Sequence, residues 1–180
     1  MRALGPGSVS SFLKTVLDVV YFAIIVMLAL LALVVIAGLL AISFVPDLFR
    51  EIADRLKIEG DVTPGGLAAL GATFAIYGML YLGALGAILS RLRKVFATLT
   101  AGDPFEPENI PRLRLIGFVL AGMELARYAL NALLLAIAPA LGWEIDGFNI
   151  TVWFSVLVVF VLAEVFREGA RLRREAELTI

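Results

Sequence analysis

The stretch that decides the fold is VVYFAIIVMLALLALVVIAGLLAISFVP, Val19–Pro46, which lies between Asp18 and Asp47 and contains no charged residue. As a helix rising about 1.5 Å per residue, it is long enough to cross a hydrocarbon core of about 30 Å. It is also longer than the apolar part of a cleavable signal peptide, which is about 7–15 residues. We therefore predict that this run is a retained membrane-spanning helix.

Three further apolar runs reach a similar length. The chain is 61% hydrophobic, whereas roughly half of the residues of a soluble domain are apolar. The predicted spans cover about 17–45, 66–90, 113–142 and 148–167. Because four spans leave no room for a sizeable soluble domain, we predict an all-α integral membrane protein. In this prediction residues 1–180 form a single membrane domain, a four-transmembrane-helix bundle.

The positive charges predict how the chain is oriented. Eleven of the 15 Lys and Arg side chains lie before the first span, between the second and third spans, or after the fourth. Three lie between the first and second spans, none lies between the third and fourth, and Arg127 is inside the third. Cytoplasmic loops carry an excess of Lys and Arg. We therefore expect both termini, the inner loop 91–112 and the tail 168–180 in the cytoplasm.

The segment between the first two spans has a helical pattern of its own. Leu48, Phe49, Ile52 and Leu56 fall on one helical face, and charged residues occupy the remainder. This pattern predicts a short amphipathic outer helix at about 47–58, lying at the outer interface or over the bundle. It is either a helical connector or a lid over a ligand.

The second span is rich in glycine and alanine. Small residues let helix backbones approach closely in a membrane. We expect this span to be the most enclosed one, either within the bundle or at a homo-oligomer contact.

Two residue types are missing from the sequence. It contains no cysteine and no histidine, so disulfides and thiolate chemistry are excluded and the commonest metal ligand is absent. No nucleophile–base pair is visible in the spans. We predict a protein that is not an enzyme and has no cofactor and no metal site.

Polar residues interrupt the third span, within LAGMELARYALNALL. Glu124, Arg127 and Asn131 recur at i, i+3 and i+7, and therefore share one face of a helix. A charge at the bilayer centre costs at least about 2.5–3.5 kcal/mol, so such residues face a partner, the bundle interior or water. Glu164, near the end of the fourth span, leans toward the depth of Arg127 because helical side chains lean toward the N-terminus of their own helix.

We therefore predict an intramembrane polar cluster of Glu124, Arg127 and Glu164, joined by Asn131 or Tyr128. Three interpretations are open: a structural pin between the third and fourth helices, a polar path for an ion or substrate, and an oligomer contact.

The predicted inner loop contains GDPFEPENIPRLR, residues 102–114. Asp103, followed by Glu106 three residues later, fits a capping box, and Asn109 is a second candidate N-cap. We expect a helical extension of the second span to end near Gly102 and a structured turn to begin the third helix.

The chain ends in LAEVFREGARLRREAELTI, residues 162–180, in which Gly169 is expected to relax or kink the helix just past the membrane. Glu168, Arg171 and Glu175 have the spacing of i,i+3 and i,i+4 ion pairs. The candidate functional residues of the two cytoplasmic segments are Gly102, Asp103, Pro104, Phe105, Glu108, Asn109, Arg112, Arg114, Phe166, Arg167, Gly169 and Arg171.

These two segments resemble the signature of a bacterial family of four-span membrane proteins, catalogued as domain of unknown function 2975. The resemblance covers essentially the whole chain and supplies no catalytic residues. It implies a multi-pass protein of the bacterial inner (cytoplasmic) membrane. Because many family members lie beside a gene for a small Cro-type helix-turn-helix regulator, it also implies a membrane partner for such a regulator.

The expected function is thus that of a regulatory or interaction protein, which acts through its cytoplasmic loop and tail. The alternative is a small transporter or channel that uses the intramembrane cluster. Expected partners are the lipid bilayer, a cytosolic protein and a second copy of the chain. Direct binding of nucleic acid is not expected, because the tail alternates Arg with Glu and is too short for a reading module.

Overall fold

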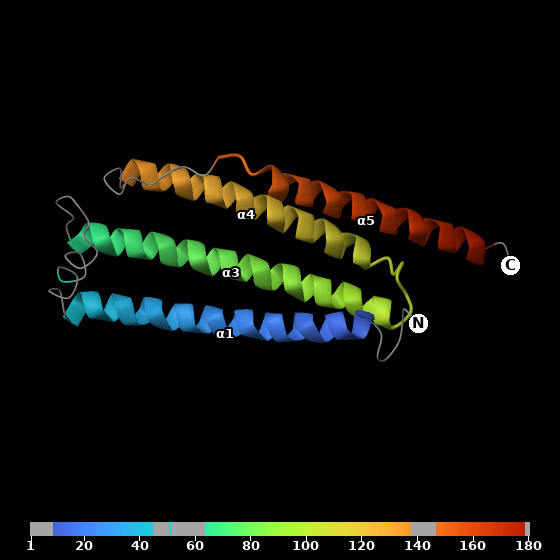
Figure 1. The fold of residues 1–180 in the computed structure, drawn as a ribbon, viewed down its shortest axis with the longest axis horizontal. Coiled ribbons are helices and arrows are strands. Elements are labelled where there is room, and N and C mark those ends of the chain that lie inside the picture. Colours follow the sequence, from blue (N-terminus) through green and yellow to red (C-terminus); the bar gives the residue numbers. More distant parts are fainter. Residues whose placement is uncertain (1–8, 45–50, 52–63, 138–146, 179–180) are drawn as a thin grey trace. The chain divides into compact units, whose positions relative to one another are not determined.

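The computed structural model describes residues 9–44, 51, 64–137 and 147–178 of the chain (Figure 1). These residues contain four helices and no strand: α1, Val9–Phe44; α3, Pro64–Thr100; α4, Asn109–Ile137; and α5, Ile150–Glu177. The amphipathic outer helix predicted at about 47–58 lies outside the described residues, apart from Glu51.

All four helices are long and apolar enough to cross a membrane. The qualifying stretches are Phe12–Gly38, Leu70–Thr100, Asn109–Ala136 and Ile150–Glu177. The prediction of an all-α chain with four long apolar helices is therefore confirmed.

Two helices continue well past the predicted spans. The second span was predicted to end near residue 90, but α3 continues to Thr100, and α5 runs past residue 167 to Glu177. In α3 the hydroxyl of Thr98 donates to the carbonyl of Val95, 2.8 Å away, inside the extension. In α5 the extension is charged and carries ion pairs between neighbouring turns, which stabilise a helix in water.

The start of α5 follows a standard capping pattern. The side-chain oxygen of Asn149 accepts hydrogen bonds from the backbone N–H groups of Thr151 and Val152. These bonds satisfy donors that have no partner inside the helix.

The chain divides into two compact units. Unit 1 comprises residues 1–25, 84–124 and 149–180, and unit 2 comprises 26–83 and 125–148. In unit 1 the buried core residues Leu113, Ile116 and Ala163 lie on α4 and α5. Ile88 and Leu92 of α3 pack against them, so three helices share this core. In unit 2, Leu134 of α4 is fully buried.

Helices α4 and α5 approach closely at Gly117. A Cβ atom added to Gly117 would lie 2.9 Å from Cε2 of Phe160. The same Phe160 ring packs edge-on against Phe118, with 5.1 Å between the ring centroids. Because Gly117 has no side chain, the ring lies directly against the α4 backbone.

The expectation that the second span is the most enclosed one is wrong. None of the most apolar stretch of α3 is buried, whereas 17% of that of α4 is. Nothing lies within 4 Å of a Cβ built on Gly71 or Gly83, whereas a Cβ built on Gly78 would lie 3.1 Å from Cδ2 of Leu31 on α1. The homo-oligomer contact suggested for this span stays a prediction.

We expect the substitution Gly117→Ala to lower the thermal unfolding midpoint of the purified protein in detergent. The added methyl group must displace the Phe160 ring, and overpacking of this kind costs about 1–3 kcal/mol. Gly122→Ala is the matched control on the same helix, because nothing lies within 4 Å of its Cβ position. It should leave the midpoint unchanged or raise it, since alanine favours a helix by up to about 1 kcal/mol over glycine. Equal midpoints for the two variants would contradict the close approach at Gly117.

Candidate functional site

The candidate residues of the inner loop lie in the turn 101–108, between α3 and α4, which belongs to unit 1. Gly102 ends α3 with a φ of 88°, a conformation that costs glycine little. The N–H of Asp103 donates to the carbonyl of Thr98, and that of Gly102 to the carbonyl of Leu99. This pair of bonds is the Schellman motif of helix C-termini. The predicted end of the helical extension near Gly102 is confirmed.

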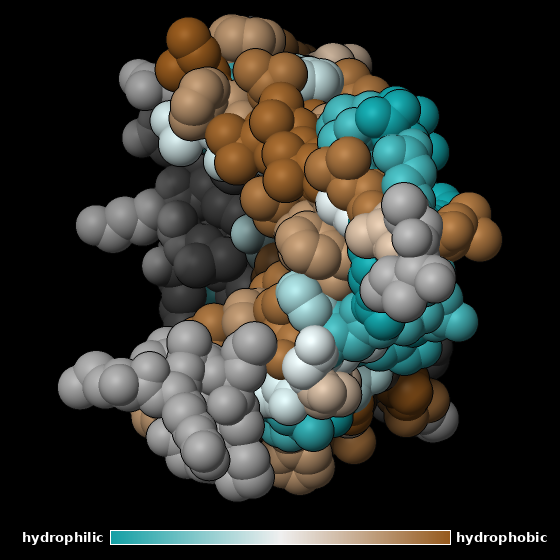
Figure 2. Space-filling model, turned by 90° about the vertical axis from the view of Figure 1, so that its right-hand side faces the viewer, coloured by the Kyte–Doolittle hydropathy of each residue, from teal (hydrophilic) through white to brown (hydrophobic). Residues whose placement is uncertain are grey.

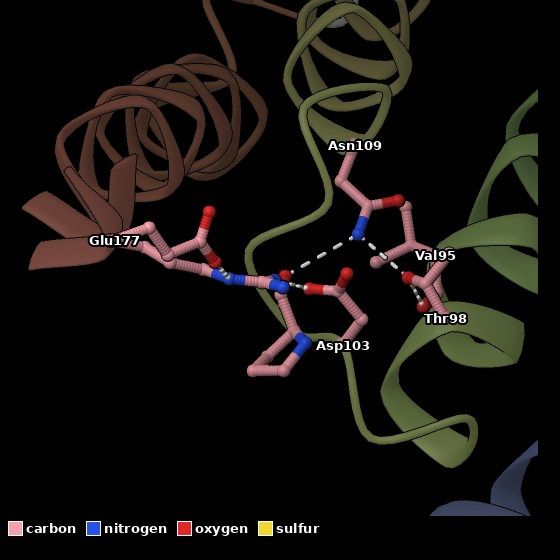
Figure 3. Close-up of polar contacts among 7 residues, drawn as sticks. Val95, Thr98, Asp103, Asn109 and Glu177 are labelled. Atoms are coloured by element: carbon pink, nitrogen blue, oxygen red, sulfur yellow. Dashed lines mark hydrogen bonds and ion pairs between the residues drawn. The ribbon is translucent and has the colours of Figure 1, made fainter. Parts of the chain in front are cut away.

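Asn109 joins the turn to both neighbouring helices, as Figure 3 shows. Its side-chain nitrogen Nδ2 donates to Oγ1 of Thr98, at 2.7 Å, and to the carbonyl of Pro104, at 3.4 Å. Its oxygen Oδ1 accepts from Nη1 of Arg112, at 3.0 Å. The residue is 0% exposed, and these hydrogen bonds give partners to both the nitrogen and the oxygen of the buried amide. Asn109 is the first residue of α4, but its side chain bridges segments and does not cap the helix as predicted.

Asp103 extends from the turn to the charged end of α5. Its Oδ1 accepts from Nη1 of Arg173 at 2.5 Å, and Nε of the same arginine donates to Glu177 at 2.9 Å (Figure 3). The capping role predicted for Asp103 together with Glu106 is therefore wrong, because α4 begins only at Asn109 and the carboxylate is bound to α5. The Arg173 and Asp103 side chains are 49% and 32% exposed. An ion pair this exposed contributes about 0–1 kcal/mol.

Phe105 packs against α5 about one helical turn before Arg173, nearer to the apolar part of this helix. A Cβ atom built on Gly169 would overlap Cδ1 and Cε1 of the Phe105 ring. The ring also meets Phe166 edge-on, with centroids 5.9 Å apart. Gly169 lies inside the continuous helix Ile150–Glu177. Its lack of a side chain leaves room for an aromatic ring from another segment. The relaxation or kink of the helix expected at Gly169 stays a prediction.

We call this set the turn–helix contact, defined by Asp103 and Phe105 of the turn and Phe166, Gly169 and Arg173 of α5. It combines a ring packed on a helix backbone with an ion pair beside it. Both segments of the predicted cytoplasmic motif thus meet in the same place.

The other motif residues pair with residues three or four positions away in the sequence. Arg112 pairs with Glu108, and Arg167 pairs with Glu164. Arg171 pairs with Glu168 at 2.6 Å and with Glu175 at 3.6 Å, which confirms the predicted spacing of ion pairs in the tail. The side chain of Arg114 is exposed. The ion pairs of Arg167 and Arg171 give α5 a surface on which opposite charges alternate.

Two residues of the site were not predicted from the sequence. Arg173 was one basic residue among several in the tail, and nothing in its spacing indicates a partner on another segment. Thr98 was one hydroxyl within a helical extension, and its bond to Asn109 depends on how the turn brings the two helices together.

The residues of the predicted intramembrane cluster are distributed over both units. Glu124, in unit 1, is 4% exposed, and Asn131, in unit 2, is 5% exposed. Arg127 donates from Nη2 to the carbonyl of Gly147 at 3.1 Å and lies 4.8 Å from the ring centroid of Tyr128. Because Arg127 and Glu164 belong to different units, the predicted cluster stays a prediction.

The described part of the chain contains no group of three or more Asp or Glu residues close enough to hold a metal ion. The turn–helix contact consists of aromatic and charged side chains.

A double-mutant cycle tests the packing of Phe105 on Gly169. Gly169→Ala should destabilise the protein by about 1–3 kcal/mol, because the new methyl group overlaps the ring. In the Phe105→Ala background the same substitution should be neutral or stabilising, since the ring is absent and alanine favours a helix. The two changes should therefore couple by about 0.5–3 kcal/mol, measured from unfolding free energies in detergent. If Gly169→Ala is equally destabilising in both backgrounds, its effect does not come from Phe105.

Comparison with known proteins gives one family match. The family model described as a protein of unknown function (DUF2975) matches residues 20–180. No curated protein and no solved structure matches the chain. The match includes the whole of the turn–helix contact and confirms the family resemblance found in the sequence. The chain therefore belongs to the DUF2975 family of proteins of unknown function.

Proposed function

We propose that this protein is a non-enzymatic protein of the bacterial inner membrane that holds a cytosolic protein partner. The face that binds the partner is formed by the turn 101–108 and the charged end of α5. The four apolar helices cross the membrane as a bundle. Both termini and the α3–α4 turn lie in the cytoplasm.

The turn–helix contact is the observation that carries this proposal. A charged helix end that only leaves a membrane needs no contact with another segment. Here Phe105 packs on the α5 backbone and Asp103 binds Arg173, beyond the apolar part of the helix. The exposed charges of α5 are thereby held in one arrangement before any partner arrives. Preorganisation lowers the entropy lost on binding.

The orientation follows from the distribution of positive charge. The α3–α4 turn and the end of α5 are both on the side that receives eleven of the 15 Lys and Arg side chains. In the proposed orientation, a cytosolic protein can reach the turn–helix contact.

The charge pattern of α5 favours a protein partner over nucleic acid. Arg171 is flanked by Glu168 and Glu175, and Arg173 by Glu177. A surface of alternating charge is unsuited to a phosphate backbone, which needs a basic patch. It suits a protein surface with the complementary pattern, because charge complementarity sets specificity and register. Within this family the partner we propose is a small helix-turn-helix regulator.

Co-purification from detergent-solubilised membranes tests this function. The full-length protein should capture a helix-turn-helix regulator encoded beside its gene. The double charge reversal Arg171→Glu with Arg174→Glu should weaken that capture about tenfold or more, a loss of at least about 1.4 kcal/mol. Lys14→Glu with Lys94→Glu is the matched control, because both lysines are exposed on α1 and α3, outside the turn and the charged end of α5.

The unfolding midpoints of all variants are measured alongside, so that a loss of folding is recognised. Failure to capture any such regulator would refute the proposal. So would capture that is unaffected by reversing the α5 charges while the protein stays folded.

A further inference from the structure

Unit 1 contains a second polar site, between α1 and α3. A pocket of about 480 Å³ lies between α1 and the last turns of α3. Its charged and aromatic lining comprises Lys14, Asp18 and Tyr21 of α1, and Arg91, Arg93 and Lys94 of α3. None of these residues belongs to the turn–helix contact.

The lining of this pocket has a large excess of positive charge. It contains four cationic side chains and a single carboxylate, that of Asp18. Like charges gathered in one pocket repel each other, and their mutual repulsion is relieved when an anion enters. The pocket therefore attracts an anionic ligand.

Arg93 is held in place by two residues of α1. Its Nε donates to Oδ1 of Asp18, and its guanidinium carbon lies 4.6 Å from the centroid of the Tyr21 ring. Asp18 therefore compensates Arg93 specifically, through the inner nitrogen of the guanidinium group. The charges of Lys14, Arg91 and Lys94 remain in excess around this fixed arginine.

The combination of side chains suits a phosphate group. Arginine presents several N–H donors in a rigid fork that matches phosphate oxygens, and lysine adds a mobile point charge. A volume of about 480 Å³ falls within the range of small-molecule sites, about 300–1,000 Å³. A phosphate group with a small polar substituent such as glycerol fits this space and this charge.

The surroundings of the pocket indicate where such a ligand comes from. The pocket lies where the predicted first span begins and the predicted second span ends, at the expected inner surface of the membrane. Next to it, Val16, Val19 and Phe22 of α1 expose apolar side chains. Figure 2 shows hydrophilic and hydrophobic side chains side by side on the end of the molecule that carries the α3–α4 turn. Basic pockets between helices at this depth are typical sites for anionic lipid headgroups.

We propose that the pocket between α1 and α3 binds the phosphate group of an anionic ligand, as a phospholipid headgroup or as a free phosphate. Lys14, Arg91 and Lys94 contact the phosphate oxygens. Arg93, fixed by Asp18 and Tyr21, forms the back of the site and orients the group. This inference goes beyond the proposed partner binding and uses different residues.

Lipid binding by the purified full chain tests the proposal. The probes are phosphatidylglycerol and phosphatidylcholine, measured by native mass spectrometry and by the rise in unfolding midpoint when each lipid is added. Phosphatidylglycerol should bind and raise the midpoint, and phosphatidylcholine, which carries a compensating positive charge, should do so at least tenfold more weakly. The triple variant Lys14→Gln, Arg91→Gln, Lys94→Gln should lose this preference.

A matched triple variant controls for total charge. Arg114→Gln, Arg171→Gln, Arg174→Gln removes the same three positive charges outside the pocket and should keep the preference for phosphatidylglycerol. If the pocket variant does not fold, the single variant Arg91→Glu provides the same test, because it places a negative charge against the phosphate. Equal phosphatidylglycerol binding by the pocket variant and the control would overturn the proposal, as would equal binding of both lipids by the unaltered protein.

Inorganic phosphate and glycerol 3-phosphate distinguish the two sources of the ligand. Release of bound phosphatidylglycerol by either compound at millimolar concentration identifies a site for free phosphates. Retention of the lipid identifies a headgroup site. The pocket variant should still capture the cytosolic partner, because its α5 surface is unchanged, so failure of one proposal leaves the other testable.

Discussion

Phe105 lies in the space that any side chain at position 169 would fill. This steric constraint ties the α3–α4 turn to α5. The contacts of Asn109 and Asp103 hold the same turn. The buried Asn109 fixes the turn relative to α3 and α4, and Asp103 is thereby placed to bind Arg173. The ion pair alone contributes little at this exposure. The packed Phe105 ring fixes the turn on α5. The ion pair between Asp103 and Arg173 then adds specificity to this contact.

Charges in unit 1 are arranged in two contrasting ways. Along α5, opposite charges alternate and pair within the helix, as Glu168, Arg171 and Glu175 do. Between α1 and α3, cations outnumber the one carboxylate of the pocket. The first arrangement suits a protein surface of complementary charge, and the second suits a phosphate. The site proposed for a cytosolic partner and the site proposed for a phosphate group therefore use separate residues.

The sequence was sufficient for features set by local composition. Runs of apolar residues predicted four long helices, the spacing of Glu168 and Arg171 predicted their pairing, and Gly102 predicted the end of α3. It was not sufficient where one residue type serves several purposes. A glycine such as Gly169 fits a kink as well as a close approach, and its spacing does not reveal that the Phe105 ring lies against it. An aspartate before a helix fits a cap as well as an ion pair, and Asp103 is bound by an arginine from another segment. Most residues of the turn–helix contact were named as candidates from the sequence, but their contacts across segments were not predicted.

The most direct test of the turn–helix contact is cross-linking within the membrane. The chain contains no cysteine, so pairs of cysteines can be introduced without a background. Asp103→Cys with Arg173→Cys should be joined by a short bismaleimide in native membranes. Asp103→Cys with Glu164→Cys should not, because position 164 lies about 13 Å farther along α5. Similar yields for the two pairs, or no cross-link between positions 103 and 173, would contradict a turn held against α5.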